Sequence, residues 1–331
     1  MSKILTVTVP SYNTEKYIDE CLPTLLDERI NDKIEILMVN DGSSDGTSAK
    51  AKTYEARYPN TIKVVDKENG GHGSTINKGI ELATGKFFKV IDGDDWVNTE
   101  EFVAFVENLE KVDADIVVNP YEDHNMDTNT IKVQEYPVDF NTVYSYDELL
   151  GKANRLPMMH ATTFRTSILK ENNITIDEKM FYVDMEYIIF PMKHLETAIY
   201  LPQKVYCYRM GTREQSVSPE NFVKNRHMHR HVTLRLIETY NDLQKVKPGS
   251  VRVEILKNQL LYEVVLDTRI IYHVSDLSVG KTEFLEYKDK VLSTNKFFWK
   301  NANSKNIKIL TKTNGFLFSL VAKRARKASI R

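Results

Sequence analysis

The sequence predicts an α/β fold with a mostly parallel sheet flanked by helices, followed by a helical C-terminal region. Short apolar runs alternate with helical patterns over residues 1–120, and polar turn residues follow several of these runs. This alternation is typical of strand–helix–strand units, whose strands pair in parallel. After about residue 221 the apolar residues recur near helical spacing to the end of the chain, which indicates helices alone.

Five apolar runs predict the strands of the parallel sheet. They are Ile4–Val9, Ile34–Val39, Ile62–Val65, Phe87–Ile91 and Ile116–Val118. Helical spacing predicts the segments between them, over residues 17–26, 47–58, 74–83 and 99–110. Pro23 should kink or end the first of these helices, because proline has no N–H to donate.

The pattern is weaker beyond residue 120. Residues 121–142 are polar and irregular, which suggests a loop or lid with a hairpin around 131–136. Helices are expected over 145–151, 166–171 and 183–195, and strands over 198–201 and 205–208. We therefore expect one α/β domain over residues 1–215, with halves 1–100 and 101–215, and a helical region over 216–331.

The composition is that of an ordinary soluble globular protein, with 331 residues and a formal net charge of −1. No stretch approaches the roughly 20 apolar residues of a membrane span. No signal peptide is recognisable at the start, so a cytoplasmic location is expected. The charge near zero argues against nucleic acid as a partner. Cys21 and Cys207 lie far apart and form neither a disulfide framework nor a zinc pattern.

Polar residues follow three of the predicted strands. These segments are Pro10-Ser11-Tyr12-Asn13, residues 40–46, and Asp92-Gly93-Asp94-Asp95-Trp96. Ligands of open parallel sheets bind beyond the carboxyl ends of the strands, so these turns should converge on one site.

Asp92 and Asp94 offer the carboxylate ligands that magnesium or manganese takes beside substrate phosphates. The alternative is that acids here form turns and cap the next helix. Asp41 can accept the imide N–H of a uracil or open an Asx-turn. Tyr12 can stack on a base or be an ordinary loop tyrosine. The glycine-rich residues 69–77 suit close backbone contact with a phosphate or sugar.

Together these motifs resemble the family 2 glycosyltransferases, which have the GT-A fold. The resemblance covers about 100 residues and rests on Val9–Asn13, Val39–Thr47, Asn69–Asn77 and Asp92–Asp95, in that order. It implies a nucleoside-diphosphate-sugar donor, with the nucleoside at Ser11, Tyr12 and Asp41, the ribose or the ion at Asp92, and Mn²⁺ or Mg²⁺ at Asp94 and Asp92. The full donor-binding set that we assign is Pro10, Ser11, Tyr12, Asp41, Asn69, Gly71, Asn77, Asp92 and Gly93.

The chain departs from the family pattern in one segment. Many relatives have an arginine before the asparagine of the third motif, whereas this chain has Ile76-Asn77, with His72-Gly73 in the preceding loop. The sugar hydroxyls that this loop recognises are therefore left open.

An inverting transfer needs a carboxylate base that deprotonates the acceptor hydroxyl. The family usually supplies it from an acid pair followed by an aromatic residue, and here Asp184 and Tyr187 match that spacing. We assign Asp184 as the base and Glu186 as its reserve; the alternative is that both are acids favoured at a helix start. His160 is assigned to the acceptor side or is a structural histidine. Arg209 or Arg213 is a phosphate ligand or a member of a surface ion pair.

The resemblance predicts transfer from a UDP-sugar to a hydroxyl of a glycan or lipid-linked acceptor, in polysaccharide, capsule or wall-glycan synthesis. Two other functions stay open: a nucleotidyltransferase that makes sugar nucleotides, and a non-catalytic nucleotide- or glycan-binding protein of this fold. The C-terminal tail either lies on anionic lipid at the inner face of the membrane or packs on the protein. Its cations are Lys305, Lys308, Lys312, Lys323, Arg324, Arg326, Lys327 and Arg331.

Overall fold

The computed structural model describes residues 3–211 and 218–327 and divides the chain into two compact units. Unit 1 comprises Met1–Thr212 and unit 2 comprises Arg213–Arg331, so the division lies close to the expected domain boundary at residue 215. The two units are described separately below.

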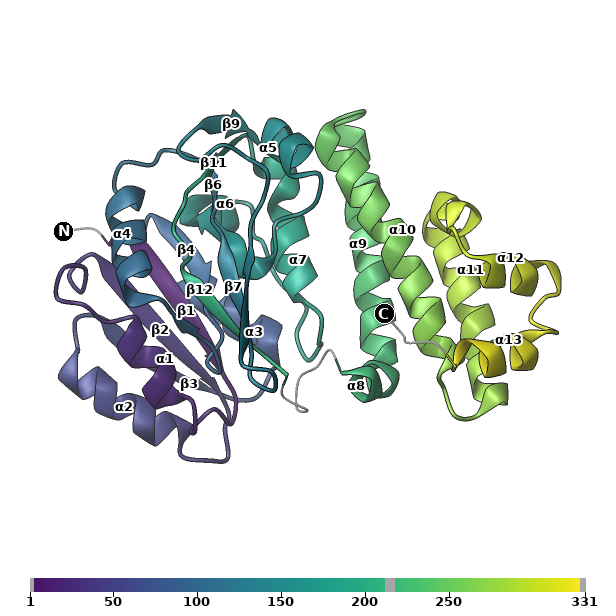
Figure 1. Ribbon diagram of the computed structural model, residues 1–331, viewed down its shortest axis with the longest axis horizontal. Coiled ribbons are helices and arrows are strands. Elements are labelled where there is room, and N and C mark those ends of the chain that lie inside the picture. The colour runs from purple at the N-terminus through teal and green to yellow at the C-terminus, as the bar shows by residue number, and fades with distance from the viewer. Residues whose placement is uncertain (1–2, 212–217, 328–331) are drawn as a thin grey trace. The chain divides into compact units, whose positions relative to one another are not determined.

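Unit 1 is built on an eight-stranded sheet with the strand order β3-β2-β1-β4-β10-β6-β11-β9 (Figure 1). The pairs β3–β2, β2–β1, β1–β4 and β6–β11 are parallel, whereas β10 and β9 pair antiparallel with their neighbours. The predicted mostly parallel sheet is thus confirmed. Its strands are β1 (Leu5–Ser11), β2 (Ile34–Asp41), β3 (Ile62–Lys67), β4 (Phe87–Val90), β6 (Ile116–Val118), β9 (Val143–Ser145), β10 (Thr162–Arg165) and β11 (Thr197–Tyr200).

The central strands are buried along their whole length, because helices cover the sheet. Helix α3 packs on β1 and β2, and α6 packs on α3, while α1 and α2 lie against each other. The helices of unit 1 are α1 (Ile18–Thr24), α2 (Thr47–Arg57), α3 (His72–Leu82), α4 (Thr99–Leu109), α5 (Tyr146–Ala153), α6 (Thr166–Glu171) and α7 (Asp184–Ile189).

Prolines and caps set several of the helix ends. Helix α1 ends at Thr24, directly after Pro23, as expected. Asn98 caps α4 through its side chain, which accepts the N–H of Glu101. The helix expected over 183–195 is instead α7 followed by a short 3-10 helix over Phe190–His194, because Pro191 interrupts the α-helical hydrogen bonding.

A second, four-stranded sheet with the order β5-β12-β7-β8 was not predicted. It consists of β5 (Trp96–Val97), β7 (Tyr121–Asn125), β8 (Thr130–Gln134) and β12 (Tyr206–Met210). The loop or lid expected over 121–142 is therefore largely a strand hairpin, and its turn lies at 126–129 rather than around 131–136. Asn125 accepts the N–H groups of Asp127 and Thr128, and Asn129 has a φ of +53°, so asparagines build the turn.

Unit 2 is helical throughout its described part, as predicted. Helices α9, α10 and α11 pack on one another, and a buried hydrogen-bond chain joins them: the imidazole of His229 lies 2.8 Å from Asp267, which accepts the hydroxyl of Tyr287 at 2.6 Å. Over residues 3–211 and 218–327, no helix has the length and apolar character needed to cross a membrane. The helices are α8 (Pro219–Lys224), α9 (Arg226–Val246), α10 (Val251–Tyr272), α11 (Leu277–Asn301), α12 (Lys305–Lys312) and α13 (Phe318–Ala325).

Candidate active site

The carboxyl ends of β1, β2 and β4 lie side by side at one edge of the large sheet. In the parallel register Ser11 is level with Asn40, and the N–H of Gly93 donates to the carbonyl of Pro10 at 2.9 Å. A Cβ on Gly93 would lie 2.8 Å from that carbonyl oxygen, so only glycine allows this approach. The turns after the three strands are therefore neighbours in space.

The turn after β1 combines a buried serine with an exposed tyrosine. Ser11 is buried and its hydroxyl donates to Val9, whereas the side chain of Tyr12 is 54% exposed. The amide of Asn13 accepts the N–H of Ser44 at 2.9 Å, which fixes this turn to the turn after β2. Tyr12 thus presents a ring to solvent from an ordered backbone.

Asp41 is buried and organises the glycine-rich segment. One oxygen of its carboxylate accepts the N–H of Gly70 at 2.9 Å and Lys67 Nζ at 2.8 Å, and the other accepts the N–H of Gly71 at 2.8 Å. Its carbonyl accepts the side-chain amide of Asn69 at 2.9 Å. Asp41, Asn69 and Gly71 therefore form one hydrogen-bonded unit at the end of β2.

The glycines of this segment provide room for another stretch of chain, residues 176–180. A Cβ on Gly73 would lie 2.2 Å from the carbonyl oxygen of Asp177, and a Cβ on Gly71, which has a φ of +81°, would lie 3.0 Å from the backbone nitrogen of Lys179. Asn77 pairs with both backbone groups of Ile176, at 2.8 Å each. Residues 176–180 precede α7, so the glycine-rich segment packs against the chain that leads into this helix.

The two acids of α7 have different surroundings. Asp184 is the first residue of the helix and is partly exposed, and its charge helps to raise the pKa of Asp92. Glu186 is fully buried and accepts the N–H of Asp177 at 2.8 Å. Asp184 therefore lies close enough to Asp92 for their charges to interact, whereas Glu186 anchors the loop before the helix.

Asp92 and Asp94 form the acidic centre of the site. Burial raises the pKa of Asp92, and burial together with the nearby charge of Asp92 raises the pKa of Asp94. His72 Nε2 lies 3.7 Å from Asp92 Oδ1. Since Gly71, next to His72, is bonded to Asp41, the turn after β2 and the acids after β4 adjoin each other.

Two residues that support this centre, Tyr206 and Asp95, were given no role in the site from the sequence. The hydroxyl of Tyr206 lies 2.6 Å from Asp95 Oδ2 and 3.1 Å from Asp92 Oδ2. Asp95 is buried and also accepts the backbone N–H of Arg209 at 2.7 Å. These bonds join positions 111 or more residues apart, so no local motif indicates them.

Arg209 is buried and supports the same turn. Its guanidinium lies over the rings of Tyr17 and Trp96, at 4.8 and 4.7 Å, donates to the carbonyl of Asp94 at 2.8 Å and pairs with Glu20. These contacts fit the ion-pair alternative better than an open phosphate ligand. Arg213 lies outside the described residues.

His160 packs against the ring of Tyr206, whose hydroxyl contacts Asp92 and Asp95. Its ring stacks on Tyr208 at 4.3 Å and meets Tyr206 edge-on at 4.6 Å, and burial lowers its pKa to about 3, so it is neutral. Ligand atoms of Asp92, Asp95 and His160 all lie within 4.8 Å of one another. Within the described part of the chain, His160 Nδ1 has no hydrogen-bond partner. His160 thus contributes an imidazole to the same cluster.

The donor set fits a hard divalent cation. Asp92 and Asp94 are carboxylates at a strand end, their raised pKa values reflect uncompensated burial, and magnesium and manganese take carboxylate oxygens. Asp92 and Asp94 would hold such an ion, with His160 and Asp95 beside it.

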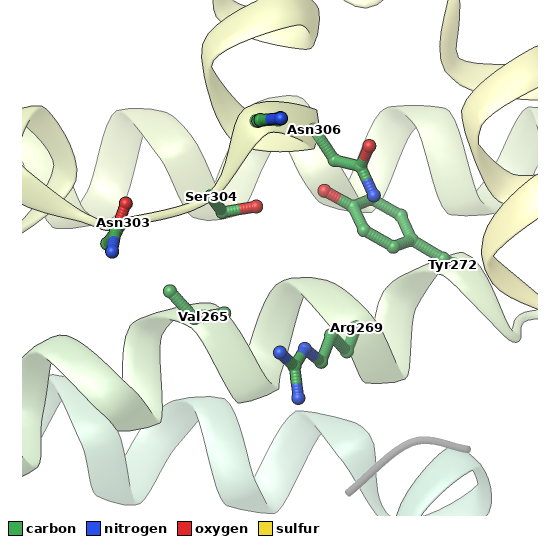
Figure 2. A pocket seen from close by; sticks show the side chains of 7 residues that line it. Val265, Arg269, Tyr272, Asn303, Ser304 and Asn306 are labelled. Atoms are coloured by element: carbon green, nitrogen blue, oxygen red, sulfur yellow. The ribbon is translucent and has the colours of Figure 1, made fainter. Parts of the chain in front are cut away.

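A separate cavity of about 240 Å³ lies in unit 2 (Figure 2). The residues that line it include no acid, so it does not suit a cation, and none of them belongs to the predicted site. They are Val265, Arg269, Tyr272, Asn303, Ser304, Lys305 and Asn306.

Comparisons with known proteins show the family of the chain. Residues 6–172, half of the chain, match the model of glycosyl transferase family 2. The chain is 27% identical over 246 residues to the glycosyltransferase EpsJ of Bacillus subtilis, covering 71% of this chain and 70% of EpsJ. It is 25% identical over 274 residues to poly(ribitol-phosphate) β-N-acetylglucosaminyltransferase TarS of Staphylococcus aureus, covering 77% of this chain but only 44% of TarS.

Solved structures show the same fold. The crystal structure of S. aureus TarS 1–349 in complex with UDP-GlcNAc matches with a TM-score of 0.70 at 18% identity, covering 98% of this chain and 91% of that one. The mannosyltransferase PcManGT of Pyrobaculum calidifontis, in complex with GDP-Man and Mn²⁺, matches with a TM-score of 0.55 at 16% identity, covering 98% and 85%. The fold is therefore GT-A, and the chain belongs to glycosyl transferase family 2 and is a glycosyltransferase.

Proposed function

We propose that the enzyme transfers a sugar from a UDP-sugar, with inversion and with the help of Mn²⁺ or Mg²⁺, to a hydroxyl of a bacterial polysaccharide or wall glycan. The observation that carries the proposal is that Asp184, far along the chain from Asp92 and Asp94, lies close enough to Asp92 for its charge to add to burial in raising the pKa of that carboxyl, while Asp92 in turn helps to raise the pKa of Asp94. The complex of TarS with UDP-GlcNAc supports a UDP-sugar, and the name of TarS supports a polymer acceptor.

The donor's nucleoside would lie over the turn after β1. Tyr12, with its exposed ring, would stack on the base, and the backbone of Pro10, Ser11 and Gly93 would face the ribose. Asp41 acts through the glycine-rich segment, because its carboxylate is already bonded to Gly70 and Gly71, and its remaining acceptor capacity would meet the uracil imide.

A divalent ion bound at Asp92 and Asp94 would neutralise the negative charge that grows on the diphosphate as the glycosidic bond breaks. Tyr206 and Arg209 keep Asp95 and the turn around these acids in place. The neutral imidazole of His160 offers a hydrogen bond to the acceptor or the diphosphate from the adjoining side.

Asp184 would act as the general base. Partly exposed at the start of α7, it can accept the proton of the acceptor hydroxyl as the oxygen attacks the anomeric carbon from the side opposite the diphosphate. Because this is a single displacement, the configuration at the anomeric carbon inverts. Glu186 is too deeply buried to share this role and instead holds Asp177.

The test is a panel of UDP-, GDP- and CMP-sugars incubated with the full chain, with nucleotide release measured with Mn²⁺, with Mg²⁺ and with a chelator. Release of UDP from a UDP-sugar that stops on chelation is the expected result. Turnover of a GDP- or CMP-sugar alone, or turnover indifferent to chelator, would contradict the proposal. A product bond that retains the donor's configuration would rule out the single displacement.

The acceptor is proposed to be presented at an anionic lipid surface, which unit 2 would contact. Near its end, Phe316 and Leu320 are 82% and 67% exposed, among the cations of α12 and α13 and with no acid after Asp289. Co-sedimentation with phosphatidylglycerol vesicles should exceed that with phosphatidylcholine vesicles and fall in Phe316→Ser. Equal binding to both kinds of vesicle, or to neither, would remove this part of the proposal.

A further inference from the structure

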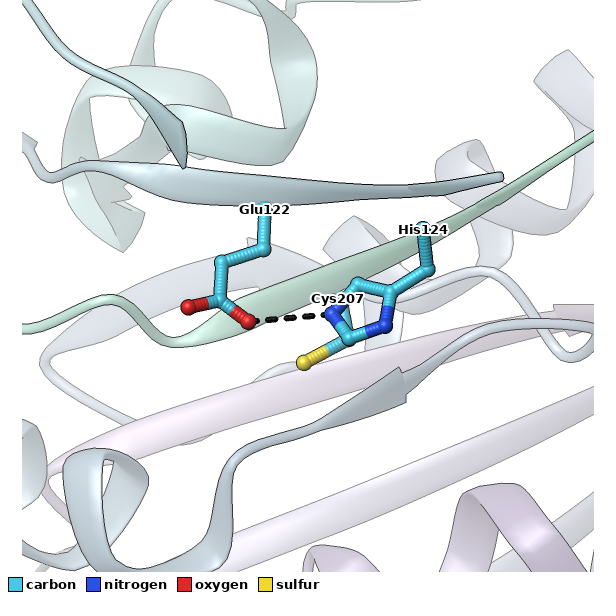
Figure 3. A group of neighbouring side chains, drawn as sticks. All are labelled: Glu122, His124 and Cys207. Carbon is cyan, nitrogen blue, oxygen red and sulfur yellow. Dashed lines mark hydrogen bonds and ion pairs between the residues drawn. The ribbon is translucent and has the colours of Figure 1, made fainter. Parts of the chain in front are cut away.

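The second sheet carries a cluster of sulfur, nitrogen and oxygen donors that the transfer reaction does not use. Glu122 and His124 lie two residues apart on β7, so both point to the same face, and Cys207 on β12 lies directly opposite Glu122 in the parallel register. Ligand atoms of the three side chains all lie within 4.8 Å of one another. Figure 3 shows the sulfur, the carboxylate and the imidazole gathered below the two strands.

This cluster lies on the face of the sheet opposite to the one on which Tyr206 and Tyr208 contact His160, and it shares its own face with Arg209. Side chains alternate along β12, so Tyr206 and Tyr208, which contact His160, point away from the side that carries Cys207. The ring of Trp96, which follows Asp95 in the chain, meets the ring of His124 edge-on at 4.8 Å and fixes the orientation of the imidazole. The cluster is thus separate from Asp92 and Asp94 but close to the strand that supports them.

We propose that Glu122, His124 and Cys207 form a binding site for Zn²⁺, with water as the fourth ligand. Thiolate, imidazole and carboxylate are the three ligand types of protein zinc sites, whereas magnesium and manganese prefer oxygen alone. Magnesium or manganese would therefore bind at the aspartates, whose ligand atoms are oxygens, and zinc would bind at the cluster that contains the sulfur of Cys207.

The distances are compatible with this assignment. His124 Nε2 already lies 3.0 Å from Glu122 Oε2. Ligands of a tetrahedral zinc ion lie about 3.3–3.8 Å apart, given metal–ligand bonds of about 2.0–2.3 Å. Ligand atoms that lie at most 4.8 Å apart therefore need to move about 1 Å toward one another to bind one zinc ion. Rotation of the side chains can supply this movement while the strands keep their hydrogen bonds.

An ion can reach the cluster from solvent. The side chains of Glu122 and His124 are 19% and 18% exposed, while Cys207 is buried behind them. Burial raises the pKa of Cys207 to about 12, so the metal-free thiol is protonated. When zinc binds, the S–H proton passes to solvent, a sulfur–zinc bond forms, and no group is oxidised or reduced.

The first test uses Co²⁺, whose bond to a thiolate gives a charge-transfer absorption that Mg²⁺ and carboxylate sites do not produce. The full chain, freed of metal and kept reduced, is titrated with Co²⁺ and then with Zn²⁺. We expect one thiolate-bound Co²⁺ per chain, which Zn²⁺ displaces and Mg²⁺ does not. A wild-type protein without the thiolate band would overturn the proposal.

Matched variants locate the ligands. The band should vanish in Cys207→Ser and persist in Cys21→Ser, which removes the other cysteine, and in Asp94→Asn, which alters the aspartate site. A band that survives Cys207→Ser would overturn the assignment.

A second variant covers the case in which Cys207→Ser does not fold. His124→Gln changes a partly exposed side chain, and it should weaken Zn²⁺ binding by at least about tenfold while the circular dichroism stays that of wild type. The control is His273→Gln in unit 2, which should bind Zn²⁺ like wild type. Unchanged affinity in His124→Gln would likewise refute the site.

Discussion

At the scale of single residues, the candidate active site concentrates buried negative charge. Burial raises the pKa of Asp92, Asp94 and Asp95, and the hydroxyl of Tyr206 offsets part of this effect for Asp92 and Asp95. A divalent cation would stabilise the ionised form of an isolated surface aspartate only slightly. It would stabilise these carboxylates more strongly, because burial disfavours their negative charge. This arrangement supports the proposal that the acids hold a divalent ion.

Tyr206→Phe should shift the pH dependence of metal binding. Its hydroxyl favours the ionised form of Asp92, so its loss raises the pKa of that carboxyl further. The ion needs ionised carboxylates, so its affinity falls as the pH decreases, and this fall should begin up to about 1 pH unit higher in the variant. Mn²⁺ affinity measured between pH 5 and 8 checks this, and an unshifted profile would contradict the assigned role of Tyr206.

Asp184→Asn should lower kcat by about 10²–10⁴, the usual contribution of a general base, while the affinity for UDP stays within about twofold of wild type. Glu186→Gln is the comparison: its carboxylate accepts the N–H of Asp177 in the interior, so this variant should mainly lower the free energy of unfolding. Steady-state kinetics and thermal unfolding of both variants check the prediction. Normal turnover by Asp184→Asn would mean that another residue is the base.

At the scale of elements, the glycine-rich segment before α3 and the loop before α7 form one packed unit. The hydrogen bonds of Asn77 with Ile176 and of Lys179 with Gly70 hold them together. The expectation that the glycines approach a phosphate remains a prediction, but the structure gives Gly71 and Gly73 another role: they let residues 176–180 approach.

Gly73→Ala should therefore impair both stability and catalysis. Its Cβ would overlap the carbonyl oxygen of Asp177, so the loop before Asp184 must move, at a cost of about 1–3 kcal/mol. Gly46→Ala is the control, because its Cβ meets only the flexible side chain of Glu15. Chemical denaturation and kcat are the measurements, and equal effects of the two substitutions would contradict the packing account.

Strand β4 contains a buried lysine that carries a second prediction at this scale. Lys89 donates to the carbonyl of His160 at 2.9 Å, and burial lowers its pKa to about 7. Between pH 7 and the unfolded pKa near 10.5, the unfolded chain binds the extra proton, so the contribution of Lys89 to stability rises with pH. Relative to Lys89→Met, wild type should gain about 2 kcal/mol between pH 7 and 9; a constant difference in unfolding free energy would contradict the shift.

The parallel sheet could be predicted from the sequence because its strands are continuous apolar runs: four of the five start at the predicted residue, and β1 starts one residue later. The second sheet could not. Strand β8 alternates apolar and polar residues, which is why a hairpin was expected near it, but β7 is polar and charged and β5 has only two residues. Strands β5 and β7 pair with β12, far along the chain, and no local pattern indicates that pairing.

The prediction of the site is also limited, because contacts between residues far apart in the sequence leave no local pattern. Asp92 and Asp94 form a local motif, but Tyr206 joins them from 114 residues away. The cysteines were interpreted as having no zinc pattern, because spacing in sequence does not report that Cys207 lies opposite Glu122. Asp184 was found only through resemblance to the family, since a lone acid at a helix start is common.

At the scale of the whole molecule, the chain joins a GT-A unit to a helical unit. Unit 1 carries every residue proposed for donor, ion and base, and unit 2 carries the basic end of the chain and its exposed aromatic residue Phe316. This division predicts that changes at the end of unit 2 alter encounter with a lipid-linked acceptor and leave UDP affinity unchanged.

The central claim is that acids from separate turns hold a divalent ion against the diphosphate of a nucleotide. Calorimetric titration of UDP into the full chain, with Mn²⁺ or with chelator, tests it directly in wild type and in Asp94→Asn. We predict UDP binding in wild type that weakens at least about tenfold on chelation, and in Asp94→Asn an affinity that is equally weak with and without Mn²⁺. Equal UDP affinity in all four titrations would contradict the account.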